Sequence, residues 1–204
     1  MLKIWGRTTS SNVQKVLWCV DELGLPFERV DIGGPFGGNK EPAYLALNPN
    51  GLVPTIEDDG VVLWESNTIL RYFATKHGKL APAAPAARAQ VEKWMDWQLS
   101  VLNGAMVPLF LGYIRTPAEK RDAAALEAAR QVAINSWTIL YRQLAGKPFV
   151  GGDAFTIGDI PVGVWAWRWF SLPFERPDLP DLRAWYERLA ARPGYKKHVA
   201  LPLA

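Results

Sequence analysis

The sequence predicts two domains of different fold class. An α/β domain is expected over residues 1–80 and an all-helical domain over residues 88–204, with a linker at residues 81–87. Three observations predict this division. Short strand-like and helix-like segments alternate before residue 80. The run Ala81-Pro82-Ala83-Ala84-Pro85 then interrupts the pattern. Beyond it, apolar residues recur every three or four positions, which is the period of amphipathic helices.

The N-terminal domain is predicted to contain a βαβ unit, a short helix, and a β-hairpin followed by a helix. Gly24 and Gly78 follow the two longer helices as stop signals, and Asp58-Asp59-Gly60 turns the hairpin. The expected elements are strand 2–5, helix 12–23, strand 27–32, helix 42–47, strands 55–57 and 61–64, and helix 66–76. This order, βαβ-α-ββα, is a thioredoxin-like arrangement.

The C-terminal domain is predicted to be helical throughout. Apolar residues spaced from Val91 to Tyr113 indicate one long amphipathic helix. Thr116-Pro117-Ala118-Glu119 has the pattern of a capping box with Pro at the first helical position, and a second long helix would follow it through Leu144. Thr156-Ile157-Gly158-Asp159 is a further capping signal, opening a Trp-rich helix through Trp169. A last helix is expected at residues 182–191.

The composition excludes several function classes. The chain has 204 residues, of which 49% are apolar and 21% charged, as in an ordinary soluble protein. Its net charge of +3 is scattered, so no nucleic-acid partner is expected. Its single cysteine, Cys19, excludes a disulfide framework, and no metal site is expected. We expect no membrane association, and a reducing, cytoplasmic location.

The segment Asn50-Gly51-Leu52-Val53-Pro54-Thr55 places a proline inside an apolar run. Proline cannot donate to a sheet ladder, and it forces the residue before it into extended geometry. A tight turn before an edge strand, often with a cis bond, satisfies both constraints. Such a turn leaves the backbone N–H and C=O of Val53 free to pair with an extended ligand.

Glu65-Ser66-Asn67 stands where a short apolar strand runs into a helix. The N–H groups and the positive dipole end of a helix N-terminus favour a carboxylate there. Together with the Val53-Pro54 turn, this predicts a site for a small peptide that has a free carboxylate.

The hydroxyl-rich run Thr8-Thr9-Ser10-Ser11-Asn12 lies between the first strand and the first helix. A thioredoxin-like domain presents its reactive group here, and a redox member would have Cys-x-x-Cys. A hydroxyl can instead stabilise a thiolate. Lowering a thiol pKa by about two units from ~8.5 needs only ~2.7 kcal/mol. The alternative is that Ser10 or Ser11 is simply the helix N-cap.

With these motifs in family order, the chain resembles the soluble, cytosolic glutathione S-transferases over almost its whole length. The shared motifs are Ser10 to Val13, Asn48-Pro49-Asn50-Gly51, Val53-Pro54, Glu65-Ser66, Thr156–Asp159 and Arg192-Pro193. It is most similar to bacterial serine-type members related to the theta and phi classes. The resemblance implies a homodimer, a detoxification role, and glutathione as a cosubstrate with no permanently bound cofactor.

The resemblance implies the following roles for single residues. Ser10 would activate the thiol of glutathione, with Ser11 as the second choice, and Asn12 could itself donate to the sulfur. The backbone of Val53 would pair with the cysteinyl residue across a cis-Pro54 turn. Glu65 would bind the γ-glutamyl ammonium group, and Ser66 its carboxylate. Asn39 or Lys40 would reach the glycine carboxylate.

Leu52 departs from the family pattern, in which Gln or Lys often precedes Val-Pro. A side-chain contact to the glycine end is therefore lost, and we expect weaker glutathione binding. The second substrate should be a small apolar electrophile. Candidate walls of its pocket are Met106, Phe110, Tyr113, Trp165 and Trp169. The alternative is that such a stripe at helical spacing forms core.

Two other functions fit the same motifs. One is a glutathione-dependent disulfide or peroxide reductase, which Asn12 keeps open. The other is a non-catalytic ligand carrier or regulator of the same fold, against which Ser10, Val53-Pro54 and Glu65-Ser66 argue.

Overall fold

The computed structural model describes residues 1–203. They group into two compact units, and each is described by itself. The first unit contains Met1–Lys79 together with Gly194–Leu201, and the second contains Leu80–Pro193 and residues 202–203. Residues 194–201, which the sequence analysis places in the helical domain, thus group with the first unit.

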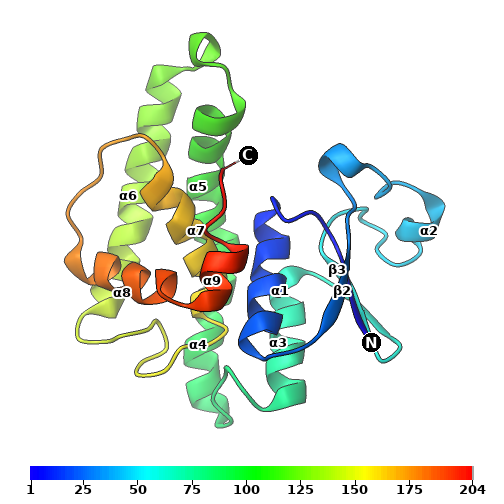
Figure 1. Cartoon of the computed structure of the whole chain (residues 1–204). Coiled ribbons are helices and arrows are strands. Elements are labelled where there is room, and N and C mark those ends of the chain that lie inside the picture. The colour runs from blue at the N-terminus through cyan, green and yellow to red at the C-terminus, as the bar shows by residue number, and fades with distance from the viewer. Residues whose placement is uncertain (204) are drawn as a thin grey trace. The chain divides into compact units, whose positions relative to one another are not determined.

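The first unit is a four-stranded sheet with helices on both faces (Figure 1). Its strand order is β2-β1-β3-β4, in which β1 and β2 are parallel and the other neighbours antiparallel. The mixed sheet confirms the predicted thioredoxin-like order. The elements are β1 (Leu2–Trp5), α1 (Ser11–Glu22), β2 (Phe27–Val30), η1 (Gly34–Phe36), α2 (Pro42–Leu45), β3 (Thr55–Asp58), β4 (Val61–Trp64) and α3 (Ser66–His77).

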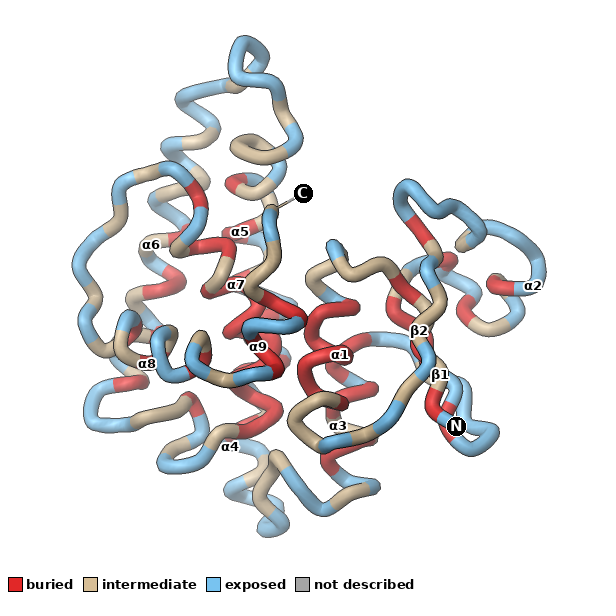
Figure 2. Tube along the Cα trace, viewed as in Figure 1, coloured by how far each residue is buried: buried red, intermediate tan, exposed pale blue. Residues whose placement is uncertain are grey.

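Helices α1 and α3 pack against each other and form the core of the first unit with the sheet. The predicted apolar face of α1, Val13 to Val20, is buried, as are Ile4 and Ile56 of the central strands. Figure 2 shows this burial as an almost continuous red band on α1. Gly78 has a left-handed backbone and caps α3, as the sequence predicts. The packing aligns the N-termini of both helices at the same end of the sheet.

A short C-terminal helix, α9 (Pro193–His198), packs on α1 within the first unit and was not predicted from the sequence. The Tyr195 ring meets the edge of Trp18 at 4.9 Å between ring centroids. Asp21 of α1 accepts from Lys197 Nζ at 2.6 Å and lies 3.3 Å from His198 Nε2. The Arg192-Pro193 pair therefore ends one helix and also begins another, because Pro suits the first helical turn.

The second unit is all-helical, as predicted. One long helical stretch runs from Pro85 to Arg115, and it includes two π-helical segments and Pro108. It starts inside the predicted linker because Pro85 occupies the first helical turn. The elements are α4 (Pro85–Trp97), η2 (Gln98–Leu102), α5 (Asn103–Phe110), η3 (Leu111–Arg115), η4 (Ala118–Lys120), α6 (Ala123–Leu144), α7 (Asp159–Ser171) and α8 (Pro180–Ala190).

This stretch is 31 residues long and contains an 18-residue window with a mean hydropathy of 1.2, which by length and composition alone would suit a membrane span. Its inner face, however, is a core face, with Met95, Leu102, Met106 and Leu109 completely buried. Those side chains pack within the helical unit. A core helix of a globular protein can also be this long and this apolar, so length and hydropathy do not distinguish it from a membrane span.

The predicted capping box at Thr116 is wrong. The Thr116 hydroxyl donates back to the carbonyl of Leu111, and residues Ala118–Lys120 form only a 3₁₀ turn. Helix α6 begins at Ala123, where the Asp122 carboxylate accepts from the backbone N–H of Ala125 at 2.9 Å. Asp122 is the better N-cap because its short charged side chain reaches that donor directly.

The segment Thr156–Asp159 lies at the start of α7, as predicted from its capping signal. The hydrogen bonds of Asp159 also reach residues outside this segment. Asp159, completely buried, accepts four hydrogen bonds, from Val150 N, Thr156 N, Thr156 Oγ1 and Trp185 Nε1, at 2.9–3.1 Å. Burial raises the pKa of Asp159, and the four donors oppose that effect. One carboxylate thus ties the start of α7 to α8 and to the preceding loop. Helix α7 in turn contacts α4, α5 and α8.

We predict that Asp159→Asn lowers the free energy of unfolding by about 2–3 kcal/mol, because an amide turns N–H groups toward donors that need an acceptor. Urea unfolding measures the loss. The exposed Asp153 in the same loop provides the matched control, and Asp153→Asn should change stability by less than ~0.5 kcal/mol. Equal effects of the two substitutions would contradict the assigned role of Asp159.

Candidate active site

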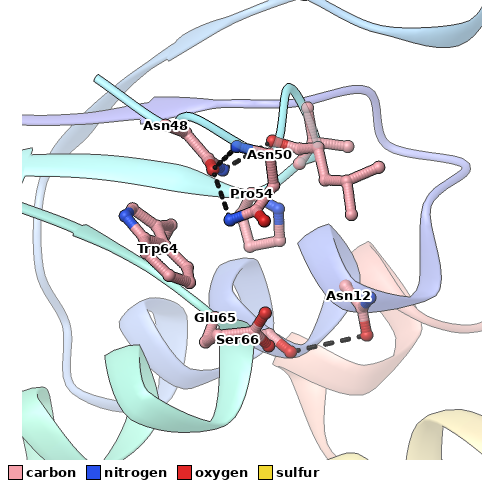
Figure 3. Close-up of a pocket in the computed structure, with 9 residues that line it drawn as sticks. Asn12, Asn48, Asn50, Pro54, Trp64, Glu65 and Ser66 are labelled. Carbon is pink, nitrogen blue, oxygen red and sulfur yellow. Dashed lines mark hydrogen bonds between the residues drawn. The ribbon is translucent and has the colours of Figure 1, made fainter. Parts of the chain in front are cut away.

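A narrow pocket of about 40 Å³ opens in the first unit, where three segments meet (Figure 3). The segments are the loop before β3, the junction of β4 with α3, and the N-terminus of α1. The residues that line it are Asn12, Asn48, Asn50, Leu52, Val53, Pro54, Trp64, Glu65 and Ser66. The structure therefore brings together six residues that the sequence singles out from three separate motifs: Asn12, Leu52, Val53, Pro54, Glu65 and Ser66.

The Val53-Pro54 peptide bond is cis, as predicted for this turn. Pro54 is buried at the base of the pocket and Val53 is half-buried at its wall. Strand β3 begins directly afterwards, at Thr55. The predicted edge strand is wrong, because β3 is an inner strand that pairs with both β1 and β4. Pro54 is tolerated because it stands before the first ladder residue. The backbone of Val53 therefore stands at the end of the sheet, where an extended peptide could pair with it.

A hydrogen-bond network holds the loop before β3 in shape. The Leu52 carbonyl accepts from Tyr44 Oη at 2.6 Å and from Asn48 Nδ2 at 2.9 Å. Both donors also lie within hydrogen-bond distance of Thr55 Oγ1. Asn48 Oδ1 accepts in turn from the backbone and side chain of Asn50, both at 3.1 Å. Asn48 thus uses both ends of its amide to fix residues 50–55.

The sequence gives no functional role to Asn48, Asn50, Tyr44 or Trp64, although three of them line the pocket. The Asn48-Pro49-Asn50-Gly51 motif could have pointed to a role for the two asparagines in the pocket. Tyr44 and Trp64 gave no such signal, because their positions depend on how α2 and β4 fold back on β3.

The Glu65-Ser66 junction has an unusual backbone. Glu65 adopts φ 68° and ψ 108°, a conformation that costs a residue with a side chain roughly 1–3 kcal/mol. It is the N-cap of α3, and its carboxyl group lies at the pocket. Ser66 is buried, and its hydroxyl donates to Asn12 Oδ1 at 3.4 Å, a long hydrogen bond that links the starts of α3 and α1 (Figure 3).

Ser10 and Ser11 are half-buried at the start of α1, but neither lines the pocket; Asn12 does. Ser10 is the N-cap by backbone conformation, and its carbonyl accepts from Gln14 N at 2.9 Å. Its side chain makes no capping hydrogen bond. Helix capping therefore does not account for the Ser10 hydroxyl, which leaves it available for a ligand.

Asn39 and Lys40 lie on the far side of the same loop. Asn39 Nδ2 donates to the Gly51 carbonyl at 2.7 Å, and Lys40 Nζ donates to the Asn50 carbonyl at 3.1 Å. Neither residue lines the pocket.

The pocket has two electrostatic regions. The helix N-termini favour an anion, and the carboxylate of Glu65 favours a cation. Two helix N-termini meet there, and neither α1 nor α3 has an acidic residue in its first turn. Glu65 supplies the negative charge at one side. Cys19 is not part of this chemistry, because it is completely buried and burial raises the pKa of its thiol.

The five predicted pocket walls of the helical unit differ in exposure. Met106, Trp165 and Trp169 are buried, and Met106 Sδ lies 3.3 Å from Trp137 Nε1. Phe110 and Tyr113 are half-exposed. Only these last two can touch a small molecule without movement of their neighbours.

No group of three or more His, Cys, Asp or Glu side chains within residues 1–203 is placed to hold a metal ion.

A thioredoxin-like domain whose pocket joins a cis-Pro turn to two helix N-termini, followed by a helical domain, defines a class of glutathione-dependent enzymes, and comparison with known proteins agrees. The family model of the glutathione S-transferase N-terminal domain matches residues 9–76, and that of the C-terminal domain matches residues 123–188. The chain belongs to the glutathione S-transferase family. It is a glutathione transferase, with glutathione as cosubstrate.

Its similarity to individual members covers whole chains. It is 40% identical to glutathione S-transferase GstB of Escherichia coli over 100% of both chains. It is 47% identical to the glutathione-bound theta-class enzyme of Xanthomonas axonopodis pv. citri, with a TM-score of 0.95 over 100% of this chain and 99% of the other. It is also 27% identical to the disulfide-bond oxidoreductase YfcG of Escherichia coli, over 90% of this chain and 87% of that protein.

We predict that Asn48→Ala raises the KM for glutathione about fivefold to tenfold, because it removes both hydrogen bonds of the amide to residues 52 and 55. Steady-state kinetics at varied glutathione concentration measure the effect. Asn50→Ala, which removes a single side-chain hydrogen bond from the same pocket, should raise KM less. A larger increase in KM for Asn50→Ala would contradict the role of Asn48 in holding the loop, and would indicate that direct contact of Asn50 with glutathione determines KM.

Proposed function

We propose that this transferase ionises glutathione at the start of α1 and conjugates it to small apolar electrophiles. The observation that carries the proposal is the Ser10 hydroxyl, which stands at the N-terminus of a 12-residue helix and is not used for capping. A hydroxyl donor and a helix dipole acting together are of the size needed to lower a thiol pKa by about two units. Ser11 and Asn12 remain the alternative donors.

The peptide part of glutathione is assigned to the pocket. Glu65 would accept from the γ-glutamyl ammonium group. Ser66 would turn its hydroxyl from Asn12 to the γ-glutamyl carboxylate, at the N-terminus of α3. The Val53 backbone would pair with the cysteinyl residue, which directs the glycine toward Asn39 and Lys40. The exposed, apolar Leu52 adds no polar contact at that end.

The reaction needs only the activated sulfur. The thiolate attacks an electrophilic carbon, and the leaving group departs or the double bond takes up a proton. Half-exposed Phe110 and Tyr113 are the proposed contacts for the apolar part of the electrophile, with Met106, Trp165 and Trp169 packed as the wall behind them. Removal of reactive electrophiles in the cytoplasm is the proposed physiological role.

Replacing Ser10 tests the proposal. Ser10→Ala should raise the apparent thiol pKa of bound glutathione by one to two units, and turnover at neutral pH should fall about tenfold or more. Stability should change little, because the hydroxyl makes no capping bond. The pH dependence of kcat/KM with a chlorinated aromatic measures both effects. Ser11→Ala is the matched control, and the same shift in that variant would assign activation to Ser11 instead. No shift in either variant would leave Asn12 or the helix terminus as the activating group.

A second candidate activity is reduction of glutathionyl disulfides or peroxides. It is supported by Asn12, which lines the pocket while Ser10 and Ser11 do not, and by the similarity to YfcG. Comparing rates on a glutathionyl mixed disulfide and on a chlorinated aromatic distinguishes the two activities. A higher rate on the disulfide would favour the reductase.

We also propose that the chain forms a homodimer through the long helical stretch. This stretch exposes two large apolar residues, Leu99 and Val101, which are 43% and 40% exposed. Exposed apolar residues that gather into a patch are typical of an interface.

Sedimentation velocity tests the homodimer. We expect a dimer at micromolar concentration, and a monomer once Leu99 and Val101 are both replaced by Glu. Val132 on α6 is even more exposed, at 53%, and Val132→Glu should leave the dimer intact. A monomeric wild-type protein, or dissociation by Val132→Glu alone, would contradict this interface.

A further inference from the structure

Arg7 carries a positive charge beside the pocket that the proposed function leaves unused. It lies between the end of β1 and the start of α1, and its side chain is half-buried. Within residues 1–203 its guanidinium takes part in no hydrogen bond or ion pair. A half-buried arginine normally satisfies its fork of N–H donors, so its position requires an explanation.

Two glycines make room for Arg7. Gly33 and Gly34 have positive φ angles of 77° and 60°. A Cβ atom on Gly34 would stand only 2.9 Å from Cδ and Nε of Arg7, and one on Gly33 would stand 3.3 Å from Nη1. The Arg7 side chain therefore lies close to a stretch of glycine backbone, in space that a larger residue at Gly34 would fill.

The same position is next to the peptide-binding turn. The Cβ position of Gly33 is 3.4 Å from Val53 Cγ1 and 3.8 Å from Asn39 Cγ. Arg7 Nη1, Val53 and Asn39 thus surround one point. Since Glu65 and Ser66 occupy the γ-glutamyl end of the pocket, the side of Val53 that faces Arg7 and Asn39 is the glycine end.

The other groups at the glycine end are already engaged. Asn39 Nδ2 donates to the Gly51 carbonyl and Lys40 Nζ to the Asn50 carbonyl. Leu52 has no polar atom in its side chain. Within the described residues, Lys40 has already committed one of its three N–H donors, whereas all the donors of Arg7 remain available there.

We propose that Arg7 binds the glycine carboxylate of glutathione, with its planar fork donating two parallel hydrogen bonds. This assignment rests on the proposed function. Arginine suits the role because its guanidinium matches a carboxylate in geometry and stays charged at every physiological pH. Lys40, on an exposed and flexible side chain, would add a weaker interaction.

The test compares glutathione with its glycyl ethyl ester, in which the glycine carboxylate carries no charge. Affinities are measured by isothermal titration calorimetry. The wild-type protein should prefer glutathione over the ester about tenfold. Arg7→Gln should lose about tenfold in affinity for glutathione and less than twofold for the ester. Arg7→Lys, which keeps the charge without the fork, should fall between the two.

Two further variants serve as controls. Arg142→Gln removes a positive charge from α6 in the other unit and should leave the preference for glutathione unchanged. Lys40→Gln tests the competing residue and should reduce the preference less than Arg7→Gln does.

Two results would overturn the Arg7 assignment while glutathione still binds. One is an equal loss of affinity for glutathione and ester in Arg7→Gln, and the other is a larger loss of preference in Lys40→Gln. Absence of glutathione binding to the wild-type protein would instead contradict the proposed function itself.

Discussion

The packing of α1 and α3 against one face of the sheet is the constraint on which the site depends. The apolar face Val13–Val20 of α1 and the buried Ile69, Leu70 and Phe73 of α3 fix both helices side by side. Strand β1 leads into α1 and strand β4 leads into α3, and both strands finish at the same end of the sheet. The N-termini of both helices therefore lie at one pocket. The Ser66–Asn12 hydrogen bond spans the two starts. The proposed anion site therefore rests on core packing, through partial charges of the two helix N-termini that no single side chain provides.

A second, polar layer completes the pocket from the other side of the sheet. Tyr44 and Asn48 hold the Leu52 carbonyl, and both also meet Thr55. Most members of this network are buried, so their hydrogen bonds determine a single loop shape. The Val53 backbone is presented by that rigid loop, and Glu65 is held opposite in a backbone conformation that residues with side chains rarely adopt. Binding geometry is thus built before any ligand arrives.

Much of this could be predicted from the sequence, where a local pattern dictates a local structure. The turn at Val53-Pro54, the Gly78 stop and the capping role of Asp159 all depend on residues within a few positions of each other. The features that the sequence did not predict depend on competition between nearby capping residues or on contacts between residues distant in the chain. Thr116 has an ideal capping pattern, yet Asp122 caps α6 instead.

Tertiary contacts explain what the sequence did not reveal about the site. Asn48 matters because its amide meets Leu52 and Thr55 across a folded loop. Arg7 stands out only once Gly33 and Gly34 are seen to leave space for it. Helix α9 is stabilised by Asp21, more than 170 residues away in the chain. The spacing of apolar residues along the sequence does not predict contacts of this kind.

The central claim is that the start of α1 holds glutathione as a thiolate. The ultraviolet difference spectrum of the protein titrated with glutathione between pH 5 and pH 9 tests it most directly. Thiolate absorbance that develops well below the pKa of a free thiol, about 8.5, is the predicted result. Bound glutathione that ionises only near that value would contradict the account, since binding would then occur without activation.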